Sequence, residues 1–331
     1  MTRRELLFFA AAASALKANP PKTEIGIAST SYMTVWRPRD SIEFLEHCHA
    51  IGASGIQSNL SSTDPAYLNR LRAKAEEYGM YIEVMVPLPK SGDTSAFEHA
   101  LAAAKSVNAV AMRTGALSGR RYETFKSLSQ WNEFKSQSLA AIEAALPLVE
   151  KNRIPLGIEN HKDWTIAEAA ALMKKYSSEY LGMTLDFGNN IALLDDPMAI
   201  LELAPYAVVT HLKDMAVEPY EQGFLLSEVP LGAGILDLHK IVAAVRAARP
   251  RTRMTLEMIT RDPLQVPCLT ENYWITFPDR NGVFLARTMS MVRQNAKGRL
   301  PRMAATKDAQ LRQEEENVLA SLFWVRNQLT A

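Results

Sequence analysis

Four short apolar segments of the sequence each end in a side chain that can bind a divalent cation. The run 156–158 leads to Glu159, and three later runs lead in the same way to Asp186, His211 and Glu257. Three carboxylates and one imidazole suit a hard or borderline divalent cation. Mn²⁺ is the expected ion, and Mg²⁺, Co²⁺ and Zn²⁺ are the alternatives. Without an ion, three carboxylates crowded together would repel one another and raise their pKa values.

One acid after a strand is usually a helix cap or a loop charge, and one histidine there is more often structural than a ligand. Four such endings on four successive predicted strands favour a joint site. In a parallel barrel, the C-terminal ends of all strands face one rim, so these four side chains can converge there.

Strand and helix patterns alternate along the chain with almost no interruption. The predicted strands lie at 24–28, 55–57, 81–86, 109–112, 156–159, 181–185, 207–210 and 254–256. The predicted helices lie at 41–51, 65–78, 95–107, 122–151, 166–176, 197–203 and 238–248. Eight such units predict an α/β fold, a (β/α)₈ TIM barrel. A doubly wound sheet would also alternate, but it would not gather four ligands from strands five to eight on one rim.

The barrel is expected over about residues 24–260, followed by a C-terminal helical extension over about 261–331. A long connection is expected after strand seven, and residues 261–278 show no clear periodicity. Two helical stretches near 283–294 and 309–328 are expected to cover the barrel or a partner subunit. Arg312 and Glu314–Glu316 are interpreted as a solvated helix face.

Residues 1–18 are interpreted as a signal peptide. Arg3 and Arg4 precede an apolar, Ala-rich run to Leu16 that is too short to span a membrane comfortably. The Arg pair is typical of a twin-arginine signal, and a small-residue cleavage site ends at Ala18. The mature chain would then be one domain, 19–331, periplasmic or secreted and without a membrane span. An ordinary amphipathic N-terminal helix is the alternative.

Composition narrows the classes of function. The chain has 331 residues, 47% of them hydrophobic, and a formal charge of +1. The near-zero charge gives no electrostatic basis for binding nucleic acid or an anionic membrane. Cys48 falls within a helical pattern and is expected to be a buried thiol. A disulfide with Cys268 stays open at this level.

The sequence resembles the xylose isomerase-like TIM barrel superfamily, and within it the sugar phosphate isomerase/epimerase family, over roughly residues 24–260. The resemblance rests on five segments in order: Gly157–His161, Leu185–Asn189, His211–Asp214, Pro230–Asp237 and Leu256–Glu257. It implies one divalent ion held by Glu159, Asp186, His211 and Glu257. It also implies that Glu159 and Glu257 form the acid/base pair that moves a proton beside a carbonyl, and that a homo-oligomer forms.

Five further residues are predicted to bind substrate, each with a structural alternative. His161 could orient substrate or support the ligands, and Lys213 could bind hydroxyls or pair with Asp214. Arg113 could line the pocket or pair with Glu83. Trp36 could stack on a sugar ring or simply pack in a loop. The fifth residue, Asn189, is considered next.

Two positions depart from the best-known ketose 3-epimerases. Those enzymes resemble Asp-x-x-His at the third ligand strand, whereas here Asp186 is followed by Asn189. They also carry an Arg six positions after the His ligand, where this chain has Val217. Both changes affect substrate contacts rather than the metal, so a free ketose is not implied as the substrate.

The sequence therefore predicts a divalent-metal-dependent sugar isomerase or epimerase. A metal ion would stabilise the enediolate formed beside a carbonyl, and two carboxylates would move the proton. A lyase or dehydratase acting on a keto-inositol or a 3-keto-glycoside would use the same site, and a non-catalytic sugar-binding protein is a further alternative. The expected partner is a small carbohydrate and not nucleic acid.

Overall fold

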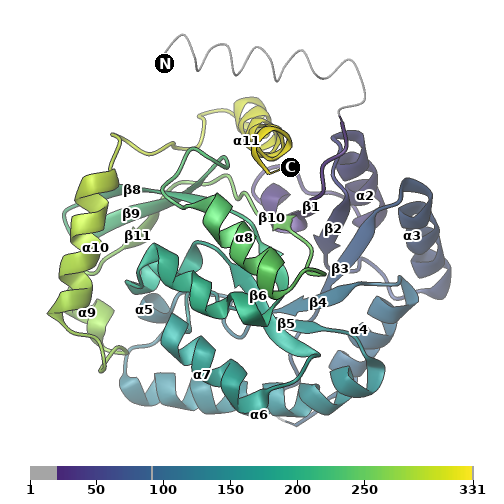
Figure 1. The fold of residues 1–331 in the computed structure, drawn as a ribbon, viewed down its shortest axis with the longest axis horizontal. Helices are drawn as coiled ribbons and strands as arrows, with labels where there is room; N and C mark the ends of the chain where they lie inside the picture. The colour runs from purple at the N-terminus through teal and green to yellow at the C-terminus, as the bar shows by residue number, and fades with distance from the viewer. Residues whose placement is uncertain (1–20, 91, 330–331) are drawn as a thin grey trace.

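A computed structural model of the chain describes residues 21–90 and 92–329, so the predicted signal peptide at 1–18 lies outside the described residues. Eight parallel strands with helices between them form a nearly closed barrel (Figure 1), which confirms the predicted TIM barrel. In chain order the barrel strands are β1 (Gly26–Ala28), β2 (Gly55–Ser58), β3 (Tyr81–Met85), β4 (Ala111–Thr114), β5 (Leu156–Glu159), β6 (Leu181–Asp186), β7 (Ala207–His211) and β10 (Thr255–Leu256).

Helices cover the outside of the barrel. Those between the strands are η2 (Ser29–Tyr32), α2 (Ser41–Ala50), α3 (Pro65–Tyr78), α4 (Ser95–Ser106), α5 (Arg121–Thr124), α6 (Leu128–Asn152), α7 (Ile166–Tyr176), η3 (Asn189–Leu193), η4 (Pro197–Tyr206) and α8 (Leu238–Ala248). The C-terminal extension contributes α9 (Glu271–Trp274), α10 (Gly282–Asn295) and α11 (Lys307–Gln328).

Local sequence signals fix several helix ends where they were expected. The carboxylate of Asp64 caps α3, Pro65 occupies its first turn, and the helix stops at Gly79 in the left-handed region at φ 59°. Helix α7 begins with a reciprocal capping box between Thr165 and Glu168. These signals set where α3 begins and ends and where α7 begins.

Strand register places the predicted ligands side by side. Glu159 is the register partner of Thr184, two residues before Asp186, and Asp186 itself pairs with His211. Strands β5 and β6 are buried along their whole length, as expected for a parallel sheet covered on both faces. The barrel closes between β7 and β10 through a bridge from Leu212 to Leu256.

The long connection expected after strand seven contains strands that the sequence did not predict. It forms a hairpin of β8 (Asp214–Tyr220) and β9 (Gly223–Val229), and β11 (Leu264–Val266) pairs with β9 to give a three-stranded antiparallel sheet. Strand β8 contains Pro219, which argues against a strand in a sequence-based prediction. The proline is tolerated because β8 lies at the edge of this sheet.

The helix predicted at 197–203 is a 3₁₀ helix, η4, that extends to Tyr206. Pro205 lies within it and has no backbone N–H to donate, which disfavours a regular α-helix. The long helix predicted over 122–151 is divided into α5 and α6. The two C-terminal helices match the predicted stretches to within two residues at each end.

Helix α11 packs on the rim of the barrel beside the segment that follows β1 (Figure 1). The carboxylate of Glu314 accepts hydrogen bonds from the backbone N–H groups of Thr34, Val35 and Trp36, at 3.1, 3.1 and 2.8 Å. Glu315 accepts a hydrogen bond from the hydroxyl of Tyr32. The prediction of a solvated face is therefore wrong for these two glutamates.

The same face of α11 reaches two more rim loops. Asn317 donates a hydrogen bond to the hydroxyl of Thr260, and the hydroxyl of Ser321 accepts one from the backbone N–H of Leu231. Positions 314, 317 and 321 follow helical spacing, so they share one face. On the other face, Arg312 and Glu316 are exposed as predicted. One helix thus joins the loops after β1, β9 and β10.

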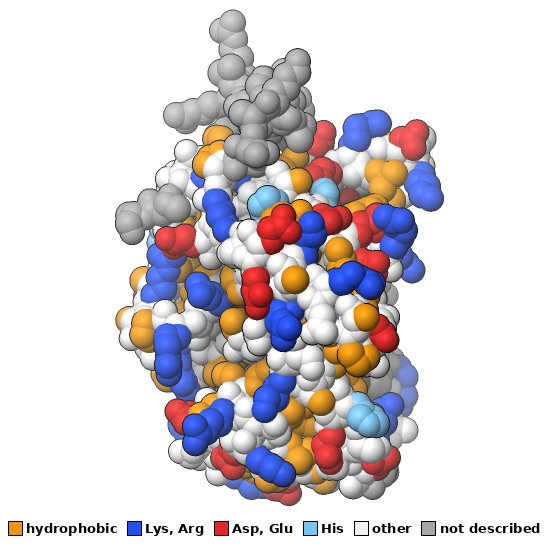
Figure 2. All heavy atoms as spheres, turned by 90° about the vertical axis from the view of Figure 1, so that its right-hand side faces the viewer, with side chains coloured by type: hydrophobic (Ala, Val, Ile, Leu, Met, Phe, Trp, Pro, Cys, Tyr) orange, Lys and Arg blue, Asp and Glu red, His pale blue; other side chains and the backbone are white. Residues whose placement is uncertain are grey.

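On the face seen in Figure 2, basic and acidic side chains are interspersed, and no large area of a single charge is visible. Cys48 and Cys268 are both buried and free, so the disulfide left open by the sequence does not form here. Among the described residues, no helix combines the length and the apolar character that crossing a membrane requires.

Candidate metal centre

The structure brings the four predicted ligands together at the C-terminal ends of β5, β6 and β7 and just after β10. Glu159, Asp186, His211 and Glu257 each offer one ligand atom, and these atoms all lie within 4.8 Å of one another. Each of these residues is at most 4% exposed. A buried cluster of three acids and one imidazole is costly without a cation to balance it.

The hydrogen bonds of His211 leave the correct nitrogen free for a metal. Its Nε2 lies 2.7 Å from Oε1 of Gln57, whose Nε2 donates to Glu83 over 2.9 Å. With the Gln57 amide oriented in this way, its oxygen accepts and Nε2 of His211 carries the hydrogen. Nδ1 then faces Glu159, Asp186 and Glu257, and a carboxylate oxygen of each lies 3.5 Å away. A cation at the centre would take the place of a proton on this nitrogen.

Among the described residues, Nδ1 of His211 has no hydrogen-bond partner. A buried nitrogen that faces three carboxylates fits a metal ligand once it gives up its proton, and the Gln57–Glu83 pair behind it is the usual support for such a ligand. The residues present therefore fit one divalent cation.

The electrostatics of the cluster point the same way. Burial alone would lower the pKa of His211, but the carboxylates of Glu257 and Glu159 outweigh it and raise that pKa to about 9. Burial would raise the pKa of Glu257, yet His211 and Lys213 hold it well below its usual range. The cluster thus keeps its carboxylates ionised and strongly favours positive charge at its centre.

Neighbouring polar groups hold each ligand in place. Thr30 donates a hydrogen bond to Oε1 of Glu257 at 2.7 Å, and Asn189 donates to Oε1 of Glu159 at 3.1 Å. Asn160 bonds both backbone groups of Asp186, each at 2.8 Å. These bonds fix the side chains before any ligand binds.

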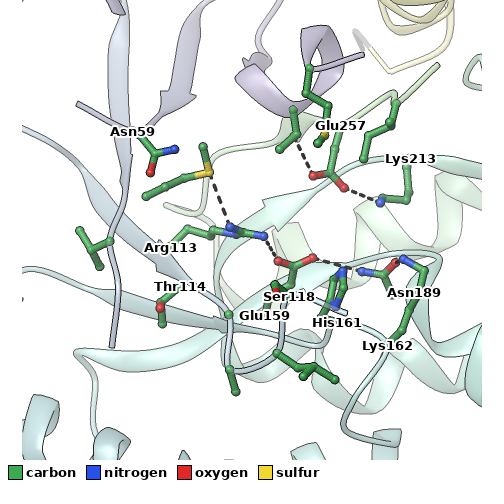
Figure 3. A pocket seen from close by; sticks show the side chains of 18 of the residues that line it. Asn59, Arg113, Thr114, Ser118, Glu159, His161, Lys162, Asn189, Lys213 and Glu257 are labelled. Atoms are coloured by element: carbon green, nitrogen blue, oxygen red, sulfur yellow. Dashed lines mark hydrogen bonds and ion pairs between the residues drawn. The ribbon is translucent and has the colours of Figure 1, made fainter. Parts of the chain in front are cut away.

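A pocket of about 630 Å³ opens onto the cluster, within the range of small-molecule sites. The predicted ligands Glu159 and Glu257 line it, and so do four of the predicted substrate residues: Arg113, His161, Asn189 and Lys213. Arg113 and Lys213 approach the centre from opposite sides (Figure 3). Arg113 pairs with Glu159, and Lys213 pairs with Asp186 and Glu257.

Trp36, the fifth predicted substrate residue, is not among the residues that line this pocket. It packs against Tyr32 and His47, with ring centroids 4.9 and 4.5 Å apart. Its backbone N–H is one of the three bonded to Glu314. In this structure Trp36 therefore belongs to the contact between the first rim loop and α11.

Neither of the two ion pairs that the sequence allowed as structural alternatives, Arg113 with Glu83 and Lys213 with Asp214, is formed. Glu83 does not meet Arg113, because it accepts hydrogen bonds from Gln57 and Thr255 inside the barrel. Lys213 and Asp214 do not pair either.

Instead, the carboxylate of Asp214 accepts hydrogen bonds from the backbone N–H groups of Gly232, Gly234 and Leu236. A Cβ atom at Gly234 would lie 2.1 Å from Asp214 Oδ1, so only glycine permits this approach. The backbone N–H groups of this loop therefore bind a carboxylate of the chain itself.

Three charged pocket residues were missed in the sequence: Lys162, Glu228 and Arg261. Lys162 follows the Glu159–His161 run and could have been found from its position alone. Glu228 lies in β9, which was not predicted as a strand, and it pairs with Arg261 at 2.7 Å. Arg261 lies at the start of the segment without periodicity.

Replacing Gln57 with Leu is expected to weaken divalent-metal binding by about 10- to 100-fold, the usual effect of removing a group that supports a ligand. His211 would lose the acceptor that fixes its tautomer, and Glu83 would lose a donor. Competition with a fluorescent chelator measures the affinity. Gln137→Leu, at an exposed position on α6, is the control. Equal affinities in both variants would contradict the role given to Gln57.

Glu83 is expected to make the stability of the protein depend on pH. Burial raises its pKa to about 7 from an ordinary value of 4.5, so the folded chain holds a proton that the unfolded chain releases. The free energy of unfolding therefore falls as pH rises between these two values and levels off above them.

In the wild type, the free energy of unfolding should fall between pH 5 and 8 because unfolding releases the proton that Glu83 holds. Glu83→Gln should make this fall smaller by up to about 3 kcal/mol, since each pKa unit corresponds to about 1.4 kcal/mol. Urea unfolding of metal-free protein at several pH values measures it. Glu202→Gln, at an exposed position, provides the comparison. Parallel pH curves for Glu83→Gln and the wild type would rule the assignment out.

The chain is similar to known proteins both in sequence and in fold. The family model for the xylose isomerase-like TIM barrel matches residues 45–274. A curated 3-oxo-isoapionate decarboxylase from Pectobacterium atrosepticum is 27% identical over 236 residues, which cover 67% of this chain and 81% of that protein.

Two solved structures are similar in fold. One is 3-keto-D-glucoside 4-epimerase from E. coli, with a TM-score of 0.55, 14% identity, and coverage of 82% of this chain and 100% of that one. The other is a xylose isomerase-like TIM barrel protein from Mycobacterium smegmatis in complex with magnesium, with a TM-score of 0.54, 15% identity, and coverage of 81% and 98%.

Proposed function

The chain belongs to the xylose isomerase-like TIM barrel family, and from this premise we propose that it is a divalent-metal-dependent isomerase or epimerase of a ketone-bearing carbohydrate. One observation carries the proposal. Glu159 and Glu257 belong to the buried ligand cluster and also line the adjoining pocket. Two carboxylates that face the same bound molecule can take a proton from carbon and return one.

The metal would be held by Glu159, Asp186, His211 and Glu257. When bound, it supplies positive charge that stabilises the enediolate formed as a proton leaves the carbon beside a carbonyl. Mn²⁺ is the ion we propose. We also propose that the segment 1–18 directs export and that the chain assembles into a homo-oligomer.

The protein side chains would carry the proton transfer. The ammonium group of Lys213 keeps Glu257 ionised and therefore able to accept a proton. Thr30 fixes the other oxygen of that carboxylate. On the other side of the pocket, Arg113 orients Glu159.

His161 would orient substrate hydroxyls. Burial and the nearby charge of Lys162 lower its pKa to about 4, so the ring is neutral near pH 7. Its Nδ1 has no hydrogen-bond partner among the described residues, although the side chain lines the pocket. A neutral imidazole there can bond a hydroxyl without competing with the metal for the carboxylates.

A lyase is the second candidate. The observation that favours it is the similarity to a decarboxylase at 27% identity, above the 14% to the 4-epimerase structure. Loss of carbon dioxide or water beside a carbonyl passes through the same type of enolate, so the same cluster and carboxylates would serve. The two candidates differ only in which bond to carbon breaks.

Mass spectrometry in D₂O tests the proposal. Mn²⁺-loaded protein is incubated with ketoses, keto-inositols, 3-keto-glycosides and keto acids, and each compound is followed for deuterium uptake and for loss of mass. Metal-dependent uptake without loss of mass is the expected result. Loss of carbon dioxide, water or an aglycone would assign a lyase instead. No change in any compound by protein with bound metal would overturn both candidates.

A further inference from the structure

Lys162 is a buried cation in the pocket whose charge the proposed reaction does not use. Its side chain is 3% exposed and lines the pocket, and its ammonium group bonds the amide oxygen of Asn189 (Figure 3). Within residues 21–90 and 92–329, no carboxylate forms an ion pair with it. An ammonium group has three donors, so this single bond leaves two of them for a ligand.

The surroundings of Lys162 are unfavourable for an ammonium ion. Burial and the charges of Lys213 and Arg261 lower its pKa to about 8, and the more weakly acting Glu228 and Asp186 do not offset them. Lys213 is occupied by Asp186 and Glu257, and Arg261 by Glu228. A buried charge without a partner is costly, and an anion bound beside it removes that cost.

The charge of the whole pocket also favours an anion. Its lining holds four cationic side chains and three carboxylates. With Asp186, which completes the ligand cluster, the number of carboxylates equals the number of cationic side chains. A divalent ion would then leave two positive charges uncompensated beside the bound substrate.

From these observations we propose that the substrate carries a carboxylate and that the ammonium group of Lys162 binds it in the pocket beside the ligand cluster. The inference rests on the proposed function only in taking the rest of the substrate to be a hydroxyketone.

A phosphate fits this pocket less well. Phosphate sites commonly use several backbone N–H groups, as at a helix N-terminus. The rim loop that has such a set of groups, at Gly232, Gly234 and Leu236, already binds the carboxylate of Asp214. Lys162 instead offers a single point of positive charge, which suits a singly charged carboxylate.

Calorimetry with matched compounds tests the proposal on Mn²⁺-loaded protein. The pairs are D-fructose with D-fructuronate, and L-sorbose with 5-keto-D-gluconate, in which a primary alcohol is replaced by a carboxylate. The acid of at least one pair should bind about 10- to 100-fold more tightly than its neutral partner, the range expected for a hydrogen bond to a charged group. No preference for the acid in either pair would overturn the proposal.

Three variants locate the preference. Lys162→Gln keeps a hydrogen-bonding side chain but removes the charge, and it should abolish the preference while the neutral compound binds as before. Lys162→Arg keeps the charge and should retain most of the preference for the acid. Lys240→Gln, at an exposed position of α8, makes the same change in net charge elsewhere and should have no effect. A preference that survives in Lys162→Gln would place the carboxylate on the metal or on another cation of the pocket and refute the assignment.

Two further outcomes are informative. D-Fructose 6-phosphate that binds as tightly as the acid would overturn the carboxylate class. Binding is measured without turnover, so this inference and the proposed reaction can fail separately. Acid-selective binding that depends on Lys162, without deuterium uptake, would retain the subsite and refute the reaction. Deuterium uptake into neutral ketoses alone would support the reaction and refute the carboxylate subsite.

Discussion

Glu257→Gln is expected to lower turnover by at least about 10²- to 10⁴-fold, the contribution of a positioned acid or base. The substitution keeps the size of the side chain but removes both a metal ligand and the charge paired with Lys213. Deuterium uptake by a compound that the wild type labels gives the measurement. Glu316→Gln makes the same chemical change at an exposed position of α11 and should match the wild type.

Metal content separates the two roles of Glu257. A variant that binds the ion at high Mn²⁺ concentration but does not label substrate has lost its base. A variant that loses the ion has lost a ligand, and Glu257→Asp should then recover part of the binding because it restores a carboxylate. Wild-type labelling by Glu257→Gln would be incompatible with the proposed mechanism.

Glu314→Ala is expected to lower the free energy of unfolding by about 3 kcal/mol. Hydrogen bonds to a charged group contribute about 1.5–3 kcal/mol each, and part of the loss of three is recovered by water. The backbone N–H groups of Thr34, Val35 and Trp36 would lose their acceptor. This segment follows Thr30, which orients Glu257, so kcat/KM should fall as well.

Urea unfolding and steady-state kinetics measure the two effects. Glu316→Ala is the matched control, because it makes the same change two residues further along the helix on the exposed face. A difference below about 0.5 kcal/mol between the variants, which is ordinary for surface substitutions, would show that α11 does not hold the first rim loop.

The barrel and the ligand cluster could be predicted because both depend on short-range patterns. Alternating strand and helix signals indicate parallel strands, and parallel strands place their C-terminal ends on one rim. Asp186 and His211 end neighbouring strands, so the predicted barrel itself brought them together. No knowledge of distant contacts was needed.

The features that were missed depend on contacts far apart in the sequence. Glu314 lies among neighbouring glutamates, and helical spacing alone does not show that its side chain meets backbone N–H groups 280 residues earlier. The β8–β9 hairpin was missed because Pro219 disfavours strands except at an edge, and the edge position follows only from the pairing with β11. Trp36 was placed in the pocket for a similar reason, since the sequence did not show where the predicted helix at 309–328 packs.

The contact between Glu314 and the first rim loop also concerns the order in which the protein is made. A ribosome releases the chain from its N-terminus at about 5–20 residues per second, so Thr34 precedes its partner 280 residues later by roughly 14–56 s. The seven barrel strands after β1 emerge within that interval, while the loop that carries Thr30 still lacks its support. The contact that supports the loop carrying Thr30 therefore forms only when synthesis is nearly complete.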